Sequence, residues 1–180
     1  NLGLEKIKQN SNVSELTREI NITDKNYPKH VISHVSAEKF IEDKSLQHEV
    51  FGPCSLIVTC QDDNEMYAVI ESLEGQLTGT VLAENNDTFL TREIIDALEL
   101  KVGRIIFNGV PTGVEVCESM THGGPYPAST DSRFTAVGIN SIKRWLRPVS
   151  FQDFPQSLLP EELKNGNPLN IKRNINGIIT

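Results

Sequence analysis

The middle of the sequence alternates between short apolar runs and longer segments with apolar residues at helical spacing. The run CSLIVTC (54–60) is nearly continuous, which is the pattern of a strand buried on both faces of a parallel sheet. LTGTVLA (77–83) and RIIFNG (104–109) predict two further strands. Segments 62–75 and 87–103 predict amphipathic helices that each end at a glycine. Strand–helix–strand–helix–strand within about 60 residues is typical of an open parallel α/β sheet with right-handed crossovers.

Shorter elements are expected before this pattern. Residues 28–36 roughly alternate between apolar and polar, which predicts a strand. The segment 36–46 that follows predicts a short helix with Ser36 as its N-cap. The first 25 residues are polar and carry two helix-like pieces, the second capped by Ser11 or Ser14.

A long segment of low periodicity, 110–134, follows the last strand of the pattern. In open α/β sheets the functional groups lie on loops past the carboxyl ends of strands, so this loop is a candidate site. A helix over 136–146 and a strand-like segment over 147–154 are expected next, before a polar end.

Composition indicates a soluble globular protein. Of the 180 residues 38% are hydrophobic and 23% charged, and the formal net charge is -7, which argues against a nucleic-acid partner. No apolar run approaches the roughly 20 residues that span a bilayer, and no signal segment opens the chain, so we expect a cytoplasmic protein without a membrane partner. Because the chain begins at Asn1 rather than Met, we expect that its start is missing.

The three cysteines, Cys54, Cys60 and Cys117, show no C-x-x-C spacing, so we expect neither a disulfide framework nor a zinc site. Each is interpreted as a small buried apolar residue, and Cys117, in the long loop, is the best placed for reactivity. His30 and His34 have no third partner in sequence, so no metal site is expected.

Two residues could carry binding or proton transfer. Glu49 precedes Phe-Gly-Pro, a rigid turn, and a carboxylate held there could accept two hydroxyls of a ribose diol. The alternative is a solvated acid at a helix end. His122 opens HGGPYP, where the glycine pair lets the backbone approach a ligand and the imidazole could carry a proton. The alternative is a tight turn with an incidental histidine.

Several segments together resemble NAD(P)-dependent aldehyde dehydrogenases, over about Pro28 to Pro155. HEVFGP resembles the E-x-F-G-P motif of that family, and LTGTVLAEN resembles the strand that follows it. GRIIFNG resembles the family's G-x-x-x-x-N segment, and THGGPYPASTD stands where the family usually has Pro-Phe-Gly-Gly. The segment KRWLRPVSFQDFP is most similar to the α-ketoglutarate semialdehyde branch.

The resemblance implies roles for matching positions. Glu49 would hydrogen-bond the ribose on the nicotinamide side of NAD or NADP, and Phe51 would pack near the nicotinamide. His122 replaces the family's usual phenylalanine, which would make the pocket more polar. The positions that would border the substrate channel are Asn108, Val114, Val116 and His122.

Three family segments are absent from the chain. The nucleophilic cysteine in G-Q-x-C, the general base in E-L-G-G and the nucleotide loop G-x-T-x-x-G have no match, and the pair Gly75-Gln76 is followed by Leu77. We therefore expect a C-terminal fragment with no catalytic residue, inactive alone. The parent would oxidise an aldehyde, expected to be α-ketoglutarate semialdehyde or a similar semialdehyde, by thiolate attack, hydride transfer to NAD(P) and hydrolysis.

The expected fold is α/β, a three-layer open parallel sheet with flanking helices, plus a C-terminal oligomerisation strand. Residues 1–145 would belong to the catalytic domain, and 146–180 would form that strand and a polar tail. A truncated sheet exposes an edge, so a homo-oligomer is expected. Two alternatives stay open: a non-catalytic binding or assembly domain of the same ancestry, and a thiol enzyme using Cys117 with His122.

Overall fold

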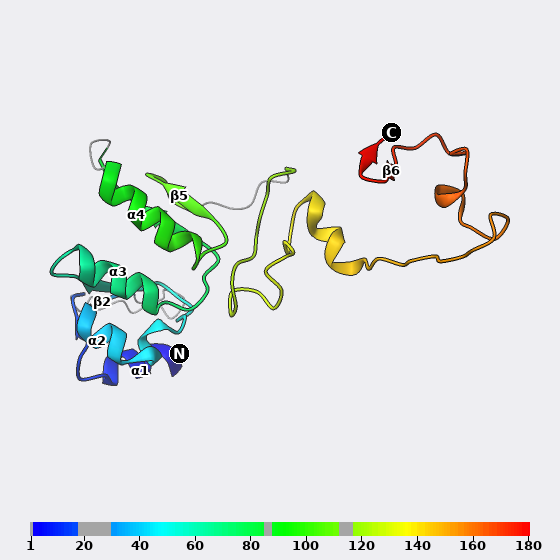
Figure 1. Ribbon diagram of the computed structural model, residues 1–180. Coiled ribbons are helices and arrows are strands. Elements are labelled where there is room, and N and C mark those ends of the chain that lie inside the picture. Colours follow the sequence, from blue (N-terminus) through cyan, green and yellow to red (C-terminus); the bar gives the residue numbers. More distant parts are fainter. Residues whose placement is uncertain (1, 18–29, 85–87, 112–116) are drawn as a thin grey trace. The chain divides into compact units, whose positions relative to one another are not determined.

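The computed structural model describes residues 2–17, 30–84, 88–111 and 117–180 (Figure 1). The chain divides into two compact units, a first unit Asn1–Arg144 and a second unit Trp145–Thr180. The helices and strands of the first unit are α1 Leu2–Gln9, β1 Ser14–Glu15, β2 Val31–Ser36, α2 Ala37–Glu42, η1 Lys44–Gln47, β3 Cys54–Thr59, α3 Asp63–Ser72, β4 Gly79–Val81, α4 Thr88–Glu99 and β5 Ile105–Phe107.

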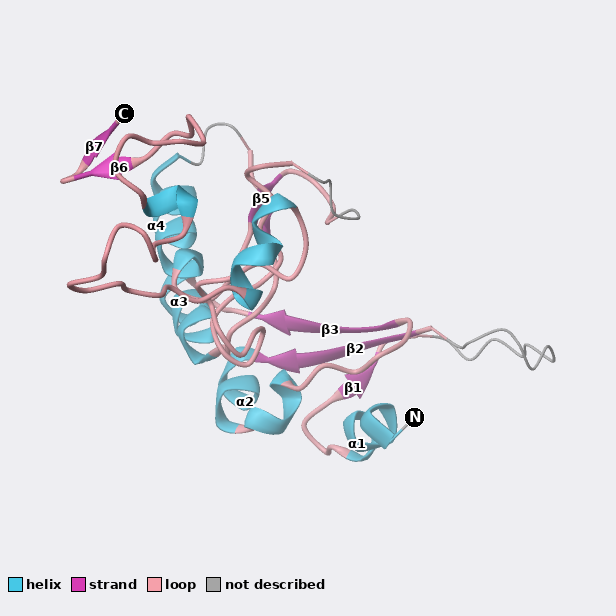
Figure 2. Cartoon of the chain, turned by 90° about the vertical axis from the view of Figure 1, so that its right-hand side faces the viewer, coloured by secondary structure: helices cyan, strands magenta, loops and turns pink. Residues whose placement is uncertain are grey.

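The predicted strands at 28–36 and 54–60 pair in parallel as β2 and β3, from Val31 opposite Cys54 to Ser36 opposite Thr59. β1 joins β2 antiparallel, so the helix expected after Ser11 or Ser14 is wrong: Ser14 lies in a strand, opposite His34. This sheet, drawn as arrows in Figure 2, buries one face only. β3 alternates between half-buried and exposed residues, so the expectation of burial on both faces is also wrong.

The covered face of β2 and β3 packs on α2 and α3. Val35, Phe40 and Leu46 form a buried cluster there, with half-buried residues of β3 and α3 around it. α2 begins after Ser36, as predicted, although the Ser36 hydroxyl makes no capping hydrogen bond. α3 begins where the side chain of Asp62 accepts from the backbone N–H of Glu65 at 2.9 Å.

β4, α4 and β5 form a second parallel arrangement within the first unit. β4 and β5 pair from Gly79 opposite Ile105 to Val81 opposite Phe107, and α4 packs on them. Ile70, Val81, Leu98 and Val102 make the buried cluster. The α/β class and the parallel pairing are therefore confirmed. The strands nevertheless form separate sheets, β1-β2-β3 and β4-β5, where the alternation predicted one.

The rest of the described chain has little regular structure. The helix predicted over 136–146 is the 3₁₀ helix η2, Ile139–Trp145. The strand expected over 147–154 is wrong: none of the strands in the described residues pairs with this segment. The second unit contains the short 3₁₀ helix η3, Glu161–Leu163, and a hairpin of β6 Asn174–Ile175 and β7 Ile178–Ile179. Among the described residues, no helix is both long and apolar enough to cross a bilayer.

Candidate functional site

The segment 121–136 is fixed by hydrogen bonds around the buried Thr135. The backbone N–H of His122 donates to Thr135 Oγ1 at 2.8 Å, and that hydroxyl donates to Val137 O at 2.8 Å. The backbone N–H of Ala136 donates to His122 O at 2.9 Å. These bonds hold the backbone of His122 from both sides.

The glycines of HGGPYP bring this segment against its own chain. A Cβ on Gly124 would overlap Gln76 O, and one on Gly103 would overlap Gly123 O. The backbone N–H of Gly75 donates to Tyr126 O at 3.2 Å. The glycine pair thus serves a close approach between two backbones, which is a structural use of the freedom that the sequence suggested for a ligand.

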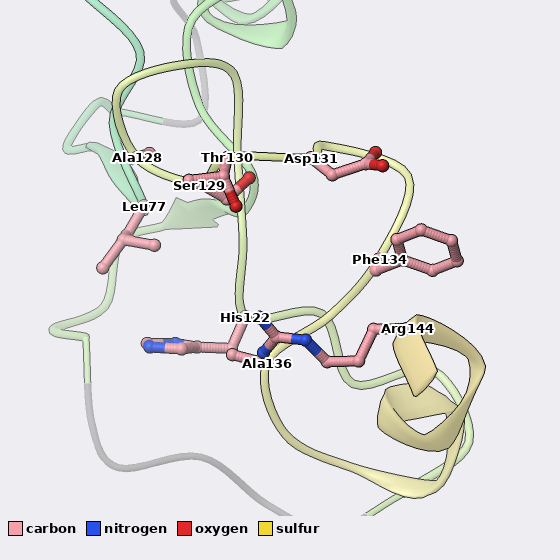
Figure 3. Close-up of a pocket in the computed structure, with 9 residues that line it drawn as sticks. All are labelled: Leu77, His122, Ala128, Ser129, Thr130, Asp131, Phe134, Ala136 and Arg144. Carbon is pink, nitrogen blue, oxygen red and sulfur yellow. The ribbon is translucent and has the colours of Figure 1, made fainter. Parts of the chain in front are cut away.

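One cavity, here called the His122 cavity, lies along this segment and has a volume of about 410 Å³ (Figure 3). Its lining residues are Leu77, His122, Ala128, Ser129, Thr130, Asp131, Phe134, Ala136 and Arg144. Arg144 extends from η2 toward His122 and Ala136 (Figure 3).

The charge of Asp131 is compensated at the wall of the His122 cavity. Nε and Nη2 of Arg133 donate to the two carboxylate oxygens of Asp131 at 2.9 and 2.6 Å. These hydrogen bonds lower the pKa of Asp131 to about 2, so the carboxylate is ionised at neutral pH. The pair is neutral as a whole, and Arg144 contributes a further positive charge to the cavity.

A second cavity, here called the Glu49 cavity, has a volume of about 520 Å³. Its lining residues are Gln47, His48, Glu49, Glu74, Gly75, Gln76, Leu77, Thr78, Pro127 and Ala128. Leu77 and Ala128 line both cavities, which places the predicted residues Glu49 and His122 on neighbouring hollows.

The Glu49 cavity suits a ligand with several hydroxyl groups. The carboxylate of Glu49 is exposed on it and can accept hydrogen bonds. Gln47 contributes an amide whose nitrogen and oxygen are both buried without a hydrogen-bond partner among the described residues. Because those two atoms are buried, they are not accessible to a ligand, and the exposed carboxylate of Glu49 is the group here that could accept from a diol such as that of a ribose.

Asn108, predicted for the substrate channel, serves the backbone between β4 and β5. Its side-chain oxygen accepts from the N–H of Ala83 at 3.0 Å, and its Nδ2 donates to Ala83 O at 2.9 Å. Its φ of 47° lies in the left-handed region, which asparagine tolerates. Phe51 is 80% exposed and lines neither cavity. Val114 and Val116 lie outside the described residues.

None of the cysteines shows the environment of an activated nucleophile in the described part of the chain. Burial, together with Glu65 and Asp62, raises the pKa of the Cys60 thiol. Cys54 is half-buried at the start of β3. The thiol of Cys117 lies 3.4 Å from Ser119 Oγ, not at His122. No described group of three or more His, Cys, Asp or Glu side chains could hold a metal ion.

Gln47 and Arg144 are site residues that sequence reasoning missed. Gln47 stands two positions before Glu49, and the motif itself begins after it. Arg144 lies beside Lys143 at the end of the helix predicted over 136–146, a pattern that predicts a solvent-exposed face. Only the folded backbone shows that the side chains line the cavities of Glu49 and His122.

The sequence is similar to curated semialdehyde dehydrogenases, although no family model matches it. It is 52% identical over 139 residues to an alpha-ketoglutaric semialdehyde dehydrogenase 2 of Azospirillum brasilense, a match that covers 77% of this chain and 26% of the relative. It is 50% identical over 135 residues to an alpha-ketoglutaric semialdehyde dehydrogenase of Acinetobacter baylyi, a match that covers 75% of this chain and 26% of that relative. This chain belongs to the aldehyde dehydrogenase family. The resemblance in the motifs is confirmed, and the chain spans about a quarter of the length of these relatives.

Solved structures share the fold of this chain. The Delta-pyrroline-5-carboxylate dehydrogenase of Mycobacterium tuberculosis superimposes with a TM-score of 0.61 at 19% identity, covering 88% of this chain and 30% of that one. The same enzyme bound with NAD gives a TM-score of 0.57 at 20% identity, covering 87% and 29%. The likeness at this identity shows the fold alone.

Proposed function

We propose that this aldehyde dehydrogenase chain supplies part of the cofactor wall and part of the substrate wall of an enzyme that oxidises a semialdehyde with NAD or NADP. The observation that carries the proposal is the placement of Glu49, from the E-x-F-G-P motif, on a cavity that shares Leu77 and Ala128 with the His122 cavity. The names of the relatives, both alpha-ketoglutaric semialdehyde dehydrogenases, support the substrate class.

The role of the Glu49 cavity is to hold and orient a ribose. The carboxylate of Glu49 accepts hydrogen bonds from the diol. When bound, NAD or NADP supplies the hydride acceptor for aldehyde oxidation. Phe51, exposed after Glu49, offers an apolar face near that site, as the family resemblance implies.

The nucleophile and the general base belong to residues outside this chain. The thiols of Cys54, Cys60 and Cys117 all lack a basic partner in the described structure, and the G-Q-x-C context is absent. The chain alone is therefore inactive. We also propose that the working enzyme is a homo-oligomer to which 146–180 contributes.

The test is steady-state kinetics of the complete protein that carries this chain, with α-ketoglutarate semialdehyde and NAD or NADP, following the absorbance of the reduced cofactor. Glu49→Gln is expected to raise the KM for the cofactor about ten- to hundredfold, because a hydrogen bond to a charged group contributes about 1.5–3 kcal/mol. Glu71→Gln, with the same change of charge on an exposed residue of α3, serves as control and leaves KM unchanged.

Cys117→Ala is expected to keep full turnover in the same assay. Turnover that disappears with Cys117→Ala would overturn the proposal in favour of a thiol enzyme built on this loop. A complete protein that oxidises no aldehyde at all would favour the alternative of a binding or assembly domain.

A further inference from the structure

We propose that the second unit carries a site of spontaneous covalent modification at Asn165–Gly166, where the side-chain amide is lost and aspartate or isoaspartate is formed. The sequence contains three Asn-Gly pairs: Asn108–Gly109, Asn165–Gly166 and Asn176–Gly177. Because glycine has no side chain to shield its own nitrogen, each asparagine is open to attack by the backbone that follows it. The three pairs differ in how firmly the structure holds the asparagine.

The reaction needs no partner other than water. The backbone nitrogen of Gly166 attacks the side-chain carbonyl carbon of Asn165, so a C–N bond forms and the bond from that carbon to the amide nitrogen breaks. The amide nitrogen leaves as ammonia, with the proton of the attacking N–H, and a cyclic imide remains. Water then opens the ring at either of its carbonyl groups, which gives aspartate or isoaspartate without any oxidation or reduction.

The reacting groups of Asn165–Gly166 are exposed, in the segment that connects η3 to β6 (Figure 1). The backbone N–H of Asn165 donates to Gln156 Oε1 at 2.8 Å, but its side-chain amide makes no hydrogen bond with any described residue. The N–H of Gly166 donates to no acceptor in the same part of the chain, and a Cβ on Gly166 would have nothing within 4 Å. Neither group therefore has to break a contact before it reacts.

Asn108–Gly109 has the same chemistry but is held in place. The side-chain oxygen of Asn108 accepts from the N–H of Ala83 at 3.0 Å, and its Nδ2 donates to Ala83 O at 2.9 Å. The backbone N–H of Asn108 donates to Val81 O at 2.8 Å. Attack on the side-chain carbon requires the amide to turn away from Ala83, so both side-chain hydrogen bonds must be broken first.

Asn176–Gly177 is an intermediate case. Its side-chain amide has no hydrogen-bond partner among the described residues, but its backbone forms the turn between β6 and β7, with φ of 51° and 86°. Arg173 and Thr180 extend the hairpin by two backbone hydrogen bonds, at 3.0 and 2.9 Å. Closure of the imide ring needs the asparagine backbone to rotate, and the hairpin resists that rotation.

The product at Asn165 would lie among groups that hold its segment. Nη1 of Arg173 donates to Lys164 O at 2.8 Å, so a guanidinium contacts the residue before Asn165. A new carboxylate there is favoured by the charges of Lys164 and Arg173. In isoaspartate the main chain is also longer, so the modification alters the contacts that tie this segment to Gln156 and Arg173.

The test follows all three pairs in the complete protein that carries this chain, incubated under native conditions. Peptide mass spectrometry measures each pair, because replacement of the amide by a carboxyl group changes the peptide mass, and chromatography separates aspartate from isoaspartate. Asn165 is expected to convert about five- to hundredfold faster than Asn108, the factor that two net hydrogen bonds supply, with Asn176 between them.

The same protein unfolded in guanidinium chloride is the control, because the native contacts are lost and the three pairs are expected to convert at similar rates. Asn165→Gln lengthens the side chain and disfavours ring closure, so it should remove the modified peptide of this pair and leave those of Asn108 and Asn176 unchanged. Conversion at Asn165 no faster than at Asn108 in the folded protein would overturn the inference. So would an equal ratio of the two rates in the folded and unfolded proteins, which would assign the difference to local sequence alone.

Discussion

The two units of the chain differ in what they do with their apolar residues. The first unit holds every buried hydrophobic residue of the described structure, and most of them form two clusters around Val35 and Val81. The second unit, all of whose residues are described, buries none: Trp145 is 78% exposed and Ile179 is 74% exposed. Apolar content alone therefore does not make a core.

The difference follows from backbone pairing. In the first unit two parallel strand pairs present their faces to helices of six to twelve residues, which cover them. The second unit has two-residue strands and a three-residue 3₁₀ helix, and it has no face on which to pack a side chain. Phe151 and Phe154 contact each other edge to face at 5.3 Å between centroids, yet both stay exposed.

The largest effect expected from this comparison concerns phenylalanine removal. Phe40→Ala empties part of the buried cluster of the first unit and is expected to cost about 3–5 kcal/mol of the free energy of unfolding. Phe154→Ala, at 43% exposure, is expected to cost less than about 1 kcal/mol in the separated chain. Urea unfolding of both variants measures the two values.

The same pair tells whether the second unit gains a core in an assembly. If Phe154→Ala costs as much as Phe40→Ala in the complete protein but not in the separated chain, a partner surface covers Phe154. If Phe154→Ala has a similarly small cost in the complete protein and in the separated chain, no partner surface covers Phe154.

The next largest expected effect compares the stability cost of one glycine substitution in each unit. Gly103→Ala places a methyl group against the backbone of Gly123, and a shift of that segment is expected to cost about 1–3 kcal/mol. Gly166, in the second unit, has nothing within 4 Å of a Cβ and a φ of +80°, so Gly166→Ala is expected to cost about 1 kcal/mol from backbone strain alone. Thermal unfolding of the two variants measures both costs, and the cost is expected to be larger for Gly103→Ala.

Much of the first unit could be predicted from the sequence, because its elements follow from local patterns. The alternation at β2 and the helical spacing in α3 and α4 each depend on neighbours within a few residues. The sequence could not show that β3 keeps one face open, since a continuous apolar run gives no sign of what covers it. The strand predicted over 147–154 was wrong, because a strand needs a partner strand that local sequence does not show.

The candidate site was predictable to a smaller extent. The motif HEVFGP identified Glu49, and the structure places that residue on a cavity. The lining by Gln47 and Arg144 depends on contacts between segments far apart in sequence. The glycines of HGGPYP indicated a close approach correctly, but the approach is to Gly75, Gln76 and Gly103 of the same chain. Local composition cannot tell a ligand from a backbone.

The smallest expected effect concerns one hydrogen bond between two α-helices of the first unit, whereas the second unit contains no α-helix. Tyr67 Oη, on α3, donates to Glu93 Oε2, on α4, at 2.7 Å. This hydrogen bond, with burial and the nearby charges of Glu93 and Asp63, raises the pKa of Tyr67 from 10.0 to about 12. The protonated phenol is thus favoured in the folded state, so its contribution to stability is fully present below pH 10 and is lost as the pH rises through about 12.

Titration of the tyrosinate absorbance measures this pKa, with Tyr67→Phe identifying which of the three tyrosines gives the late step. Glu93→Gln is expected to move that step toward lower pH, because the amide no longer favours the protonated phenol as a carboxylate does. Glu99→Gln, with the same change of charge at the far end of α4, should leave it in place. A step that does not move with Glu93→Gln would show that α3 and α4 are held together without this bond, by Ile70, Leu98 and the packing around them alone.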